Sequence, residues 1–255
     1  YGVPLLEPLA LRWMRHFHNR ADVTLAPTRE LEGFLRDAGF ERPRRLARAV
    51  DTARFDPALR DRGLRNAWGA GTDEVVVIHV GRIAAEKNLG LAVRAFRELQ
   101  AHRPRARMVW VGDGPMRAAL ARDNPDFIFC GIQRGAQLAR HFASADLFVF
   151  PSLSETFGNV TLEAMASGIA TVAFDYGAAR EHLRAGIHGA RVAGEDDFIQ
   201  AVVDIGCDDD LRAAMGRRAR SAVAGLHPDK VAADFDRLLH DIATREHVHG
   251  TVATA

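Results

Sequence analysis

Two carboxylates, Glu155 and Glu163, flank a stretch of glycine, amide and hydroxyl residues in the middle of the chain. The apolar run 147–150 precedes them and apolar residues at helical spacing follow, which predicts a strand, a short loop and the start of a helix. Gly158 would let the backbone approach a ligand, and the first N–H groups of a helix attract an anion such as a phosphate. Carboxylates accept hydrogen bonds from hydroxyls. The stretch therefore predicts a site for a molecule with both groups, such as a nucleotide sugar.

Each carboxylate by itself also has a purely structural interpretation. A Glu in the first turn of a helix favours the helix dipole, so Glu163 alone is typical of a structural residue. It is not a capping-box partner, because Asn159 as N-cap would need its Glu or Gln at Leu162. Glu155 has no helix to stabilise, and a lone Glu in a loop is usually solvated. The hypothesis depends on the residues that surround the two carboxylates.

Composition excludes several classes of function. The 255 residues are 47% hydrophobic and 26% charged, as in a globular protein with an ample core, and the net charge of +1 gives no case for nucleic acid binding. Cys130 and Cys207 stand far apart, which predicts neither a disulfide framework nor a zinc site. No apolar run approaches the roughly 18 residues that cross a bilayer, and no signal peptide opens the chain. We expect a cytoplasmic protein.

The first 50 residues do not read as a self-contained unit. Leu9, Trp13 and Phe17 form an apolar stripe beside basic residues, which predicts a basic amphipathic helix. Such a helix packs on its own sheet or lies on an anionic membrane surface, here the cytoplasmic face. The chain begins with Tyr1 rather than Met, which indicates a fragment.

The predicted organisation has four parts. We expect a strand at 23–26, a helix at 28–38 and a strand at 46–50 to be the last βαβ piece of an otherwise missing amino-terminal domain. The parts are a remnant of that amino-terminal domain over residues 1–50, an interdomain linker over 51–71, a domain over 72–245 that contains the predicted nucleotide-sugar site, and a flexible tail over 246–255.

From residue 75 onward, apolar runs alternate with helical patterns. Strands are predicted at residues 75–80, 108–111, 127–130, 147–150, 170–174 and 190–193. Continuous apolar strands joined by crossover helices predict an α/β fold with a parallel, doubly wound, Rossmann-like sheet. Ligands of such sheets bind outside the carboxyl ends of the strands, so the loops after the strands are the candidate site.

The loop after the first of these strands carries two cations. Gly81 would admit a ligand, Arg82 offers a planar fork of donors and Lys87 offers a point charge, a combination that suits a diphosphate. Only two of the 34 basic residues are Lys. The alternative is a pair of solvated cations, with Lys87 bound to Glu86.

Other ligand-binding motifs are missing. The dinucleotide pattern Gly-x-Gly-x-x-Gly fails after Gly112, because Arg117 occupies its third glycine position. No Walker motif and no serine nucleophile motif occurs. His79 lies inside a predicted strand and is interpreted as a core histidine.

Four motifs follow one another at the predicted strand ends: Val80-Gly81-Arg82 with Glu86-Lys87, Val111 to Pro115, Ala145 to Ser152, and Glu155 to Gly158 continuing through Glu163 to Gly168. Together they resemble the carboxyl-terminal half of the family 4 retaining glycosyltransferases, over about residues 45–245. The resemblance implies the GT-B fold of two facing Rossmann-like domains. The last motif, with the basic segment Arg12 to Asn19, is most similar to GDP-mannose-dependent α-mannosyltransferases that act on glycolipids.

The resemblance implies a role for each donor-binding residue. Arg82 and Lys87 would hold the diphosphate, Glu155 the hydroxyls of the donor sugar and Glu163 those of the ribose; Arg82, Lys87 and Glu155 are the predicted catalytic residues. Further donor contacts are predicted at Gly81 in the cation loop, at Gly131 and Ile132 for the base edge, and at the backbone of Phe157, Gly158, Asn159 and Val160 for the sugar and distal phosphate.

By this resemblance the protein would transfer a sugar, with retention of configuration, from GDP-mannose or a UDP-sugar to a hydroxyl of a glycolipid or polysaccharide. No metal or cofactor is expected, because preorganised cations and a helix N-terminus can stabilise the departing diphosphate. The acceptor site belongs to the amino-terminal domain, so this chain alone is expected to be inactive in transfer. Two alternatives stay open: a non-catalytic nucleotide-sugar-binding module, and a GT-B phosphorylase or synthase acting on soluble sugars.

Overall fold

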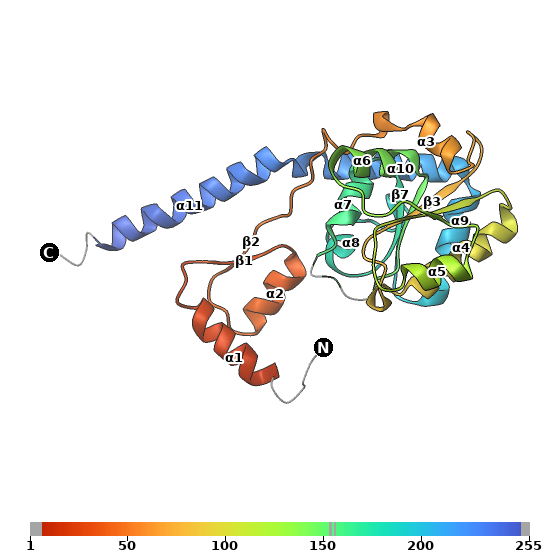
Figure 1. Cartoon of the computed structure of the whole chain (residues 1–255). Helices are drawn as coiled ribbons and strands as arrows, with labels where there is room; N and C mark the ends of the chain where they lie inside the picture. Colours follow the sequence, from red (N-terminus) through yellow and green to blue (C-terminus); the bar gives the residue numbers. More distant parts are fainter. Residues whose placement is uncertain (1–6, 153–154, 156, 251–255) are drawn as a thin grey trace. The chain divides into compact units, whose positions relative to one another are not determined.

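The computed structural model describes residues 7–152, 155 and 157–250, which belong to two compact units (Figure 1). The large unit is Val50–His227. The small unit combines Tyr1–Ala49 with Pro228–Ala255.

A six-stranded parallel sheet forms the centre of the large unit. Across the sheet the strands are β5 (Ile128–Phe129), β4 (Arg107–Val111), β3 (Val76–Val80), β6 (Leu147–Phe150), β7 (Ala170–Phe174) and β8 (Gly189–Val192). In the centre, Val77 of β3 lies opposite Met108 of β4 on one side and Leu147 of β6 on the other. All five residues of β3 are buried, as expected of a strand covered on both faces. The six predicted strands are confirmed, with small differences at their ends.

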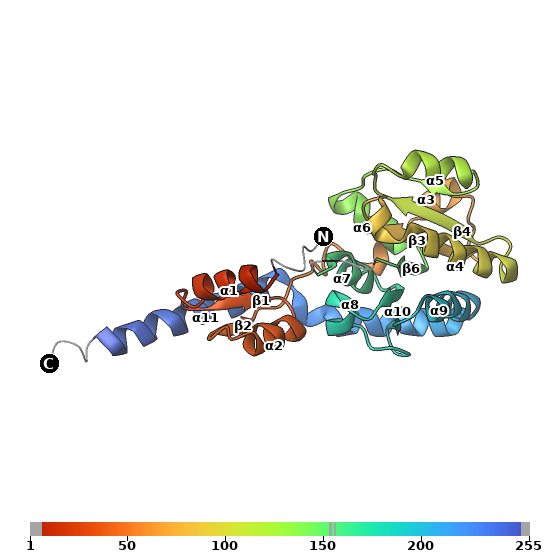
Figure 2. The same ribbon diagram turned by 90° about the horizontal axis from the view of Figure 1, so that it is seen from below.

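Helices cover both faces of this sheet, because successive side chains of each strand point to opposite sides. They are α3 (Arg62–Ala67), α4 (Leu89–His102), α5 (Arg117–Asp123), α6 (Gly135–Ser144), α7 (Asn159–Ala166), α8 (Gly177–His182), α9 (Glu195–Cys207) and α10 (Asp209–Val223), with short 3-10 turns η1 (Pro57–Leu59), η2 (Ala85–Lys87) and η3 (Ala224–Leu226). Ile78 packs in the core beneath α6 and α7, whereas Val77 packs with α4 and α9, which lie side by side (Figure 2). The doubly wound arrangement follows.

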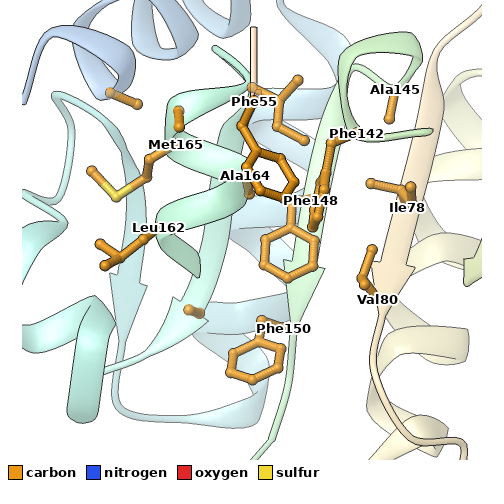
Figure 3. Close-up of a cluster of buried hydrophobic side chains, with 14 of the residues drawn as sticks. Phe55, Ile78, Val80, Phe142, Ala145, Phe148, Phe150, Leu162, Ala164 and Met165 are labelled. Carbon is orange, nitrogen blue, oxygen red and sulfur yellow. The ribbon is translucent and has the colours of Figure 1, made fainter. Parts of the chain in front are cut away.

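Aromatic rings fill the core between α7 and β3. Figure 3 shows Phe55, Phe148 and Phe150 beside α7, and the ring centroids of Phe148 and Phe150 are 5.7 Å apart. Phe142 of α6 meets Phe148 edge to face at 5.5 Å. Leu162, like the rings, is buried. This packing fixes α7, and with it the loop between β6 and α7, against the sheet.

Residues 51–71 are part of the large unit. Their turn-rich sequence predicts a linker, but Phe55 and Trp68 are buried in the core beside α6. Arg65 is also buried, and its guanidinium binds Asp146 at 2.9 Å and the carbonyl oxygens of neighbouring residues. The segment is therefore a structural element, because it contributes both apolar rings and a buried cation that needs its partner.

The small unit contains α1 (Glu7–His18), β1 (Thr24–Ala26), α2 (Arg29–Asp37), β2 (Pro43–Arg45) and α11 (Pro228–Gly250). As predicted, α2 follows β1, with the Thr28 hydroxyl accepting a hydrogen bond from the Leu31 N–H at 3.1 Å. The second strand is not at residues 46–50 as predicted. It lies at 43–45, where it pairs in parallel with β1 from Thr24 to Ala26. Val50 instead binds the carbonyl oxygen of Leu226 in the large unit.

The apolar stripe of α1 stays exposed. Trp13 and Phe17 are 68% and 61% exposed, and their rings stack with centroids 5.9 Å apart. Leu11 packs against the small core of the unit. Within the described residues, no helix combines the length and the apolar character needed to cross a bilayer.

The carboxyl-terminal boundary also differs from the prediction. The large unit ends at His227 rather than at residue 245, because none of the side chains described from Pro228 to Thr244 is buried. Residues 246–250, predicted as part of a flexible tail, continue α11. Residues 251–255 lie outside the described residues.

Candidate active site

Strands β3 and β6 lie next to each other, yet the chain leaves them in opposite directions. From β3 it continues through α4 to β4, and from β6 through α7 to β7 on the other side. At such a divergence, the space outside the carboxyl ends of the two strands is the crevice in which sheets of this kind bind ligands. Lys87 follows β3 and Glu155 follows β6, so the crevice lies between two of the predicted site residues.

Lys87 and Glu155 form an ion pair across this crevice. Their side chains are only 15% and 20% exposed. The alternative pairing of Lys87 with Glu86 is wrong, because Glu86 binds the exposed guanidinium of Arg82 at 3.3 Å. The two cations of this loop therefore differ: one is solvated, and the other is largely withdrawn from water.

Two further residues hold Glu155 in place. The hydroxyl of Ser152 donates to Oε1 of Glu155 at 3.2 Å. The hydroxyl of Tyr176, in the loop after β7, donates to the carbonyl oxygen of Ser152. Burial raises the pKa of Tyr176 to about 12, so this hydroxyl stays protonated near neutral pH. Strand ends β3, β6 and β7 thus meet in one network of side chains.

Glu163 lies one turn into α7 and is largely buried. Burial raises the pKa of its carboxyl to about 7. Its Oε2 atom is inaccessible to water and has no hydrogen-bond partner among the described residues. A buried acceptor without a donor is costly, so this position suits a ligand that brings hydroxyl donors.

The start of α7 places backbone groups beside these carboxylates. Gly158 caps the helix in the left-handed region, with φ of 87°, and a Cβ atom there would come within 3.3 Å of the Phe150 ring. The N-cap is therefore Gly158 rather than Asn159 as predicted; the helix begins at Asn159, whose side chain is exposed. Phe157 is buried and accepts a hydrogen bond from the Ala178 N–H at 2.7 Å. Val160 is half-buried, so this turn presents both packed and accessible groups.

A hollow of about 290 Å³ opens at the ends of β3, β4 and β5. Among the residues that line it are Gly81, Arg82, Ile132 and Gln133. Ile132 is 60% exposed, so it forms an apolar rim, and Gly131 before it is in the left-handed region with φ of 64°. The hollow has room for a flat ring or a phosphate group next to the Arg82 side chain.

Two close approaches shape this hollow. A Cβ atom on Gly112 would stand 1.9 Å from the carbonyl oxygen of Gly81, and one on Gly114 would stand 2.4 Å from that of Ile83. Glycine is required at both positions, because the two loops touch through their backbones.

The predicted site residues therefore fall into three neighbouring sets. Lys87 and Glu155 are in contact, Arg82 shares a hollow with Ile132, and the residues from 157 to 163 belong to the β6–α7 connection. All follow carboxyl ends of one sheet. Sequence reasoning did not assign roles to Ser152 and Tyr176. Their position directly after predicted strands was the available signal, but their link to Glu155 depends on the fold.

His79 behaves as the core histidine that the sequence predicts. It is fully buried, with Nδ1 3.2 Å from the carbonyl oxygen of Val149. Burial lowers the pKa of its imidazole to about 4. Among the described residues, no group of three or more His, Cys, Asp or Glu side chains is arranged to hold a metal ion.

Residues 74–208 match the family model described as glycosyl transferases group 1. The chain belongs to this family. It is 39% identical over 185 residues to a GDP-mannose-dependent alpha-mannosyltransferase of Mycobacterium tuberculosis, a match that covers 71% of this chain and 46% of the relative. A protein of the same description from Mycolicibacterium smegmatis is 41% identical over 183 residues, covering 71% of this chain and 47% of the relative. The chain spans about half the length of these curated relatives.

Solved structures share the fold. The Anabaena protein HepE, crystallised with UDP, matches with a TM-score of 0.80 at 20% identity, covering 92% of this chain and 68% of HepE. Sucrose-phosphate synthase from Thermosynechococcus elongatus matches with a TM-score of 0.79 at 21% identity, covering 93% and 62%. The prediction of a Rossmann-like sheet typical of the second half of a GT-B glycosyltransferase is confirmed.

Proposed function

We propose that this chain carries the donor-binding half-site of a retaining glycosyltransferase that moves mannose from GDP-mannose, or a hexose from a UDP-sugar, to an acceptor hydroxyl. The observation that carries the proposal is the meeting of Lys87 and Glu155 in the crevice between β3 and β6. A nucleotide sugar needs a cation for its diphosphate and a hydrogen-bond acceptor for its sugar hydroxyls. Lys87 supplies the cation and Glu155 supplies the hydrogen-bond acceptor.

The chemistry of sugar transfer explains the other residues. Negative charge builds up on the diphosphate as the bond to the sugar breaks, and preorganised cations lower the energy of that state. Arg82 and Lys87 would supply this charge stabilisation, and the N–H groups at the start of α7 would add to it. Glu163, with its unpartnered buried Oε2, would accept hydrogen bonds from the ribose. The hollow rimmed by Ile132 would take the base.

We further propose that the acceptor is a glycolipid or polysaccharide, and that α1 contacts an anionic membrane surface. The exposed Trp13 and Phe17 beside basic residues support this contact. Because the chain spans about half the length of its curated relatives, we expect it to bind donor without transferring sugar. Orienting the acceptor and excluding water require further protein around the donor.

Titration calorimetry with GDP, GDP-mannose, UDP and UDP-glucose tests the donor site. The wild-type chain should bind one base class, and Arg82→Ala or Lys87→Ala should weaken binding by about 1.5 to 3 kcal/mol, the range for hydrogen bonds to charged groups. Lys230→Ala and Arg122→Ala remove the same charges elsewhere and should change nothing. Unchanged affinity in both site variants would reject the phosphate role.

A transfer assay then separates an enzyme from a binding module. The chain joined to the amino-terminal half of a mannosyltransferase relative should transfer sugar to a lipid acceptor, and the chain alone should not. Binding without transfer in the joined protein would favour the non-catalytic module. Transfer only to soluble sugars would favour the phosphorylase or synthase alternative.

A further inference from the structure

The Lys87–Glu155 ion pair joins two groups that a donor would use separately. Under the proposed function, on which this inference rests, the diphosphate takes Lys87 and the sugar hydroxyls take Glu155. In the structure each of these groups is the partner of the other, and both are largely withdrawn from water. A bound donor must therefore replace the pair with two new contacts.

We propose that this exchange makes the site favour the sugar-bearing donor over the sugar-free nucleoside diphosphate. A diphosphate on Lys87 brings a second anion close to the Glu155 carboxylate, and like charges at short range repel. A sugar places hydroxyl donors at that carboxylate and compensates for the loss of the ammonium. A nucleoside diphosphate without sugar leaves Glu155 uncompensated, so the product of transfer binds weakly and leaves readily.

Two hydrogen bonds from neighbouring residues keep Glu155 in position when Lys87 changes its partner. The Ser152 hydroxyl donates to its Oε1 atom, and Tyr176 holds the Ser152 carbonyl. Ser152 is completely buried, so its position is fixed by packing. The Glu155 carboxylate therefore stays in place when the Lys87 ammonium binds the phosphate. The repulsion between this carboxylate and the phosphate is not relieved by movement.

The neighbouring pair of Arg82 and Glu86 offers a matched control. This pair also joins a cation proposed to bind phosphate, Arg82, to a carboxylate. Its two side chains, however, are 66% and 36% exposed and come from positions four residues apart in one loop. Water screens such a pair, and it contributes little. Replacing the Arg82–Glu86 pair with a contact between Arg82 and phosphate should therefore give no comparable preference for the sugar-bearing nucleotide.

Calorimetric titration compares GDP with GDP-mannose, and UDP with UDP-glucose, in four variants of the whole chain: Glu155→Gln, Glu86→Gln, Lys87→Met and the double variant Lys87→Met with Glu155→Gln. Glu155→Gln should bind the sugar-free nucleotide roughly 3- to 10-fold more tightly than wild type, since it keeps an acceptor but removes the repelling charge. In this variant the affinity for the sugar-bearing nucleotide should exceed that for the sugar-free nucleotide by much less than in wild type. Glu86→Gln should stay within about twofold of wild type for both ligands. In a Lys87→Met background there is no ion pair to give up, so Glu155→Gln should strengthen sugar-free binding by a smaller factor than it does in wild type.

A second measurement observes the exchange directly. The chain has two lysines, so labelling with ¹⁵N-lysine yields Nζ signals from Lys87 and Lys230 alone. Addition of the sugar-free nucleotide should move the Lys87 signal and leave the Lys230 signal in place.

The possible failures are distinguishable. If wild type binds none of the four nucleotides, the proposed function is wrong. If wild type binds them but Glu155→Gln leaves sugar-free affinity unchanged or weaker, the exchange is wrong and the donor site stands. An equal gain in Glu86→Gln, or an unmoved Lys87 signal at saturation, would also overturn the exchange.

Discussion

Replacing Glu163 with Gln should raise the stability of the protein relative to wild type as the pH rises, and should lower its affinity for nucleotides. The carboxyl of Glu163 is largely buried, and its Oε2 atom has no partner among the described residues. Burial therefore raises the pKa to about 7, from an ordinary value of 4.5. Gln has nearly the same shape and never carries the charge.

The size of the effect follows from the two pKa values. Below pH 4.5 the carboxyl of Glu163 is protonated in both the folded and the unfolded chain, so it costs nothing. Between pH 4.5 and about 7 the unfolded chain ionises first, so the free energy of unfolding falls as pH rises. Above pH 7 the full loss of about 3 kcal/mol is present, since one pKa unit corresponds to about 1.4 kcal/mol. The free energy of unfolding of the Gln variant, relative to that of wild type, should therefore increase by this amount between acidic and alkaline pH.

Urea unfolding at pH 5 and pH 8, followed by fluorescence of the buried Trp68 and Trp110, measures this difference. Comparing the two pH values removes any constant cost of burying the Gln amide. The same variant should bind GDP and GDP-mannose equally poorly, because ribose is common to both. A difference in stability between the Gln variant and wild type that is the same at both pH values would refute the claim that the Glu163 carboxyl is buried in the folded chain.

Three other substitutions test separate parts of the structure. Tyr176→Phe should weaken sugar-bearing but not sugar-free nucleotides by about 0.5 to 1.5 kcal/mol in calorimetry, since it loosens the support of Glu155. Equal weakening of both would contradict that role. Arg65→Ala should lower the free energy of unfolding by about 3 to 5 kcal/mol in urea, because the carbonyl oxygens of Ser144, Gly71 and Glu74 lose their donor and Asp146 keeps only Arg60 as an ionic partner; a loss below about 1 kcal/mol would show the segment to be a linker after all. Gly112→Ala should destabilise by more than about 2 kcal/mol through its clash with Gly81, and a melting temperature equal to wild type would contradict the close approach.

The large sheet was readable from the sequence because its strands are buried on both faces. Such strands carry apolar side chains at nearly every position, so β6 and β3, which His79 alone interrupts, stand out as apolar runs. The parallel pairing then follows from the helical segments between them. The strand at 43–45 was missed because β2 is short and polar, with its two arginines exposed, and leaves no apolar run. Only its pairing with β1 identifies it.

Residues 51–71 illustrate a second kind of limit. Proline, glycine and charged residues are typical of a linker, and Phe55, Arg65 and Trp68 are scattered among them. Their burial depends on surfaces contributed by residues about 80 positions later, such as Asp146. Local composition carries no information about such a partner.

For the site, the sequence by itself determined which loops carry the chemistry, because the carboxyl ends of parallel strands share one edge of a sheet. Gly81, Arg82 and Glu155 could be assigned to that edge from their order alone. The tertiary structure decided that Lys87 pairs with Glu155 rather than with Glu86, and that Glu163 is largely withdrawn from water. Ion pairing and desolvation depend on which distant groups come within a few ångströms, and that distance is a property of the folded chain alone.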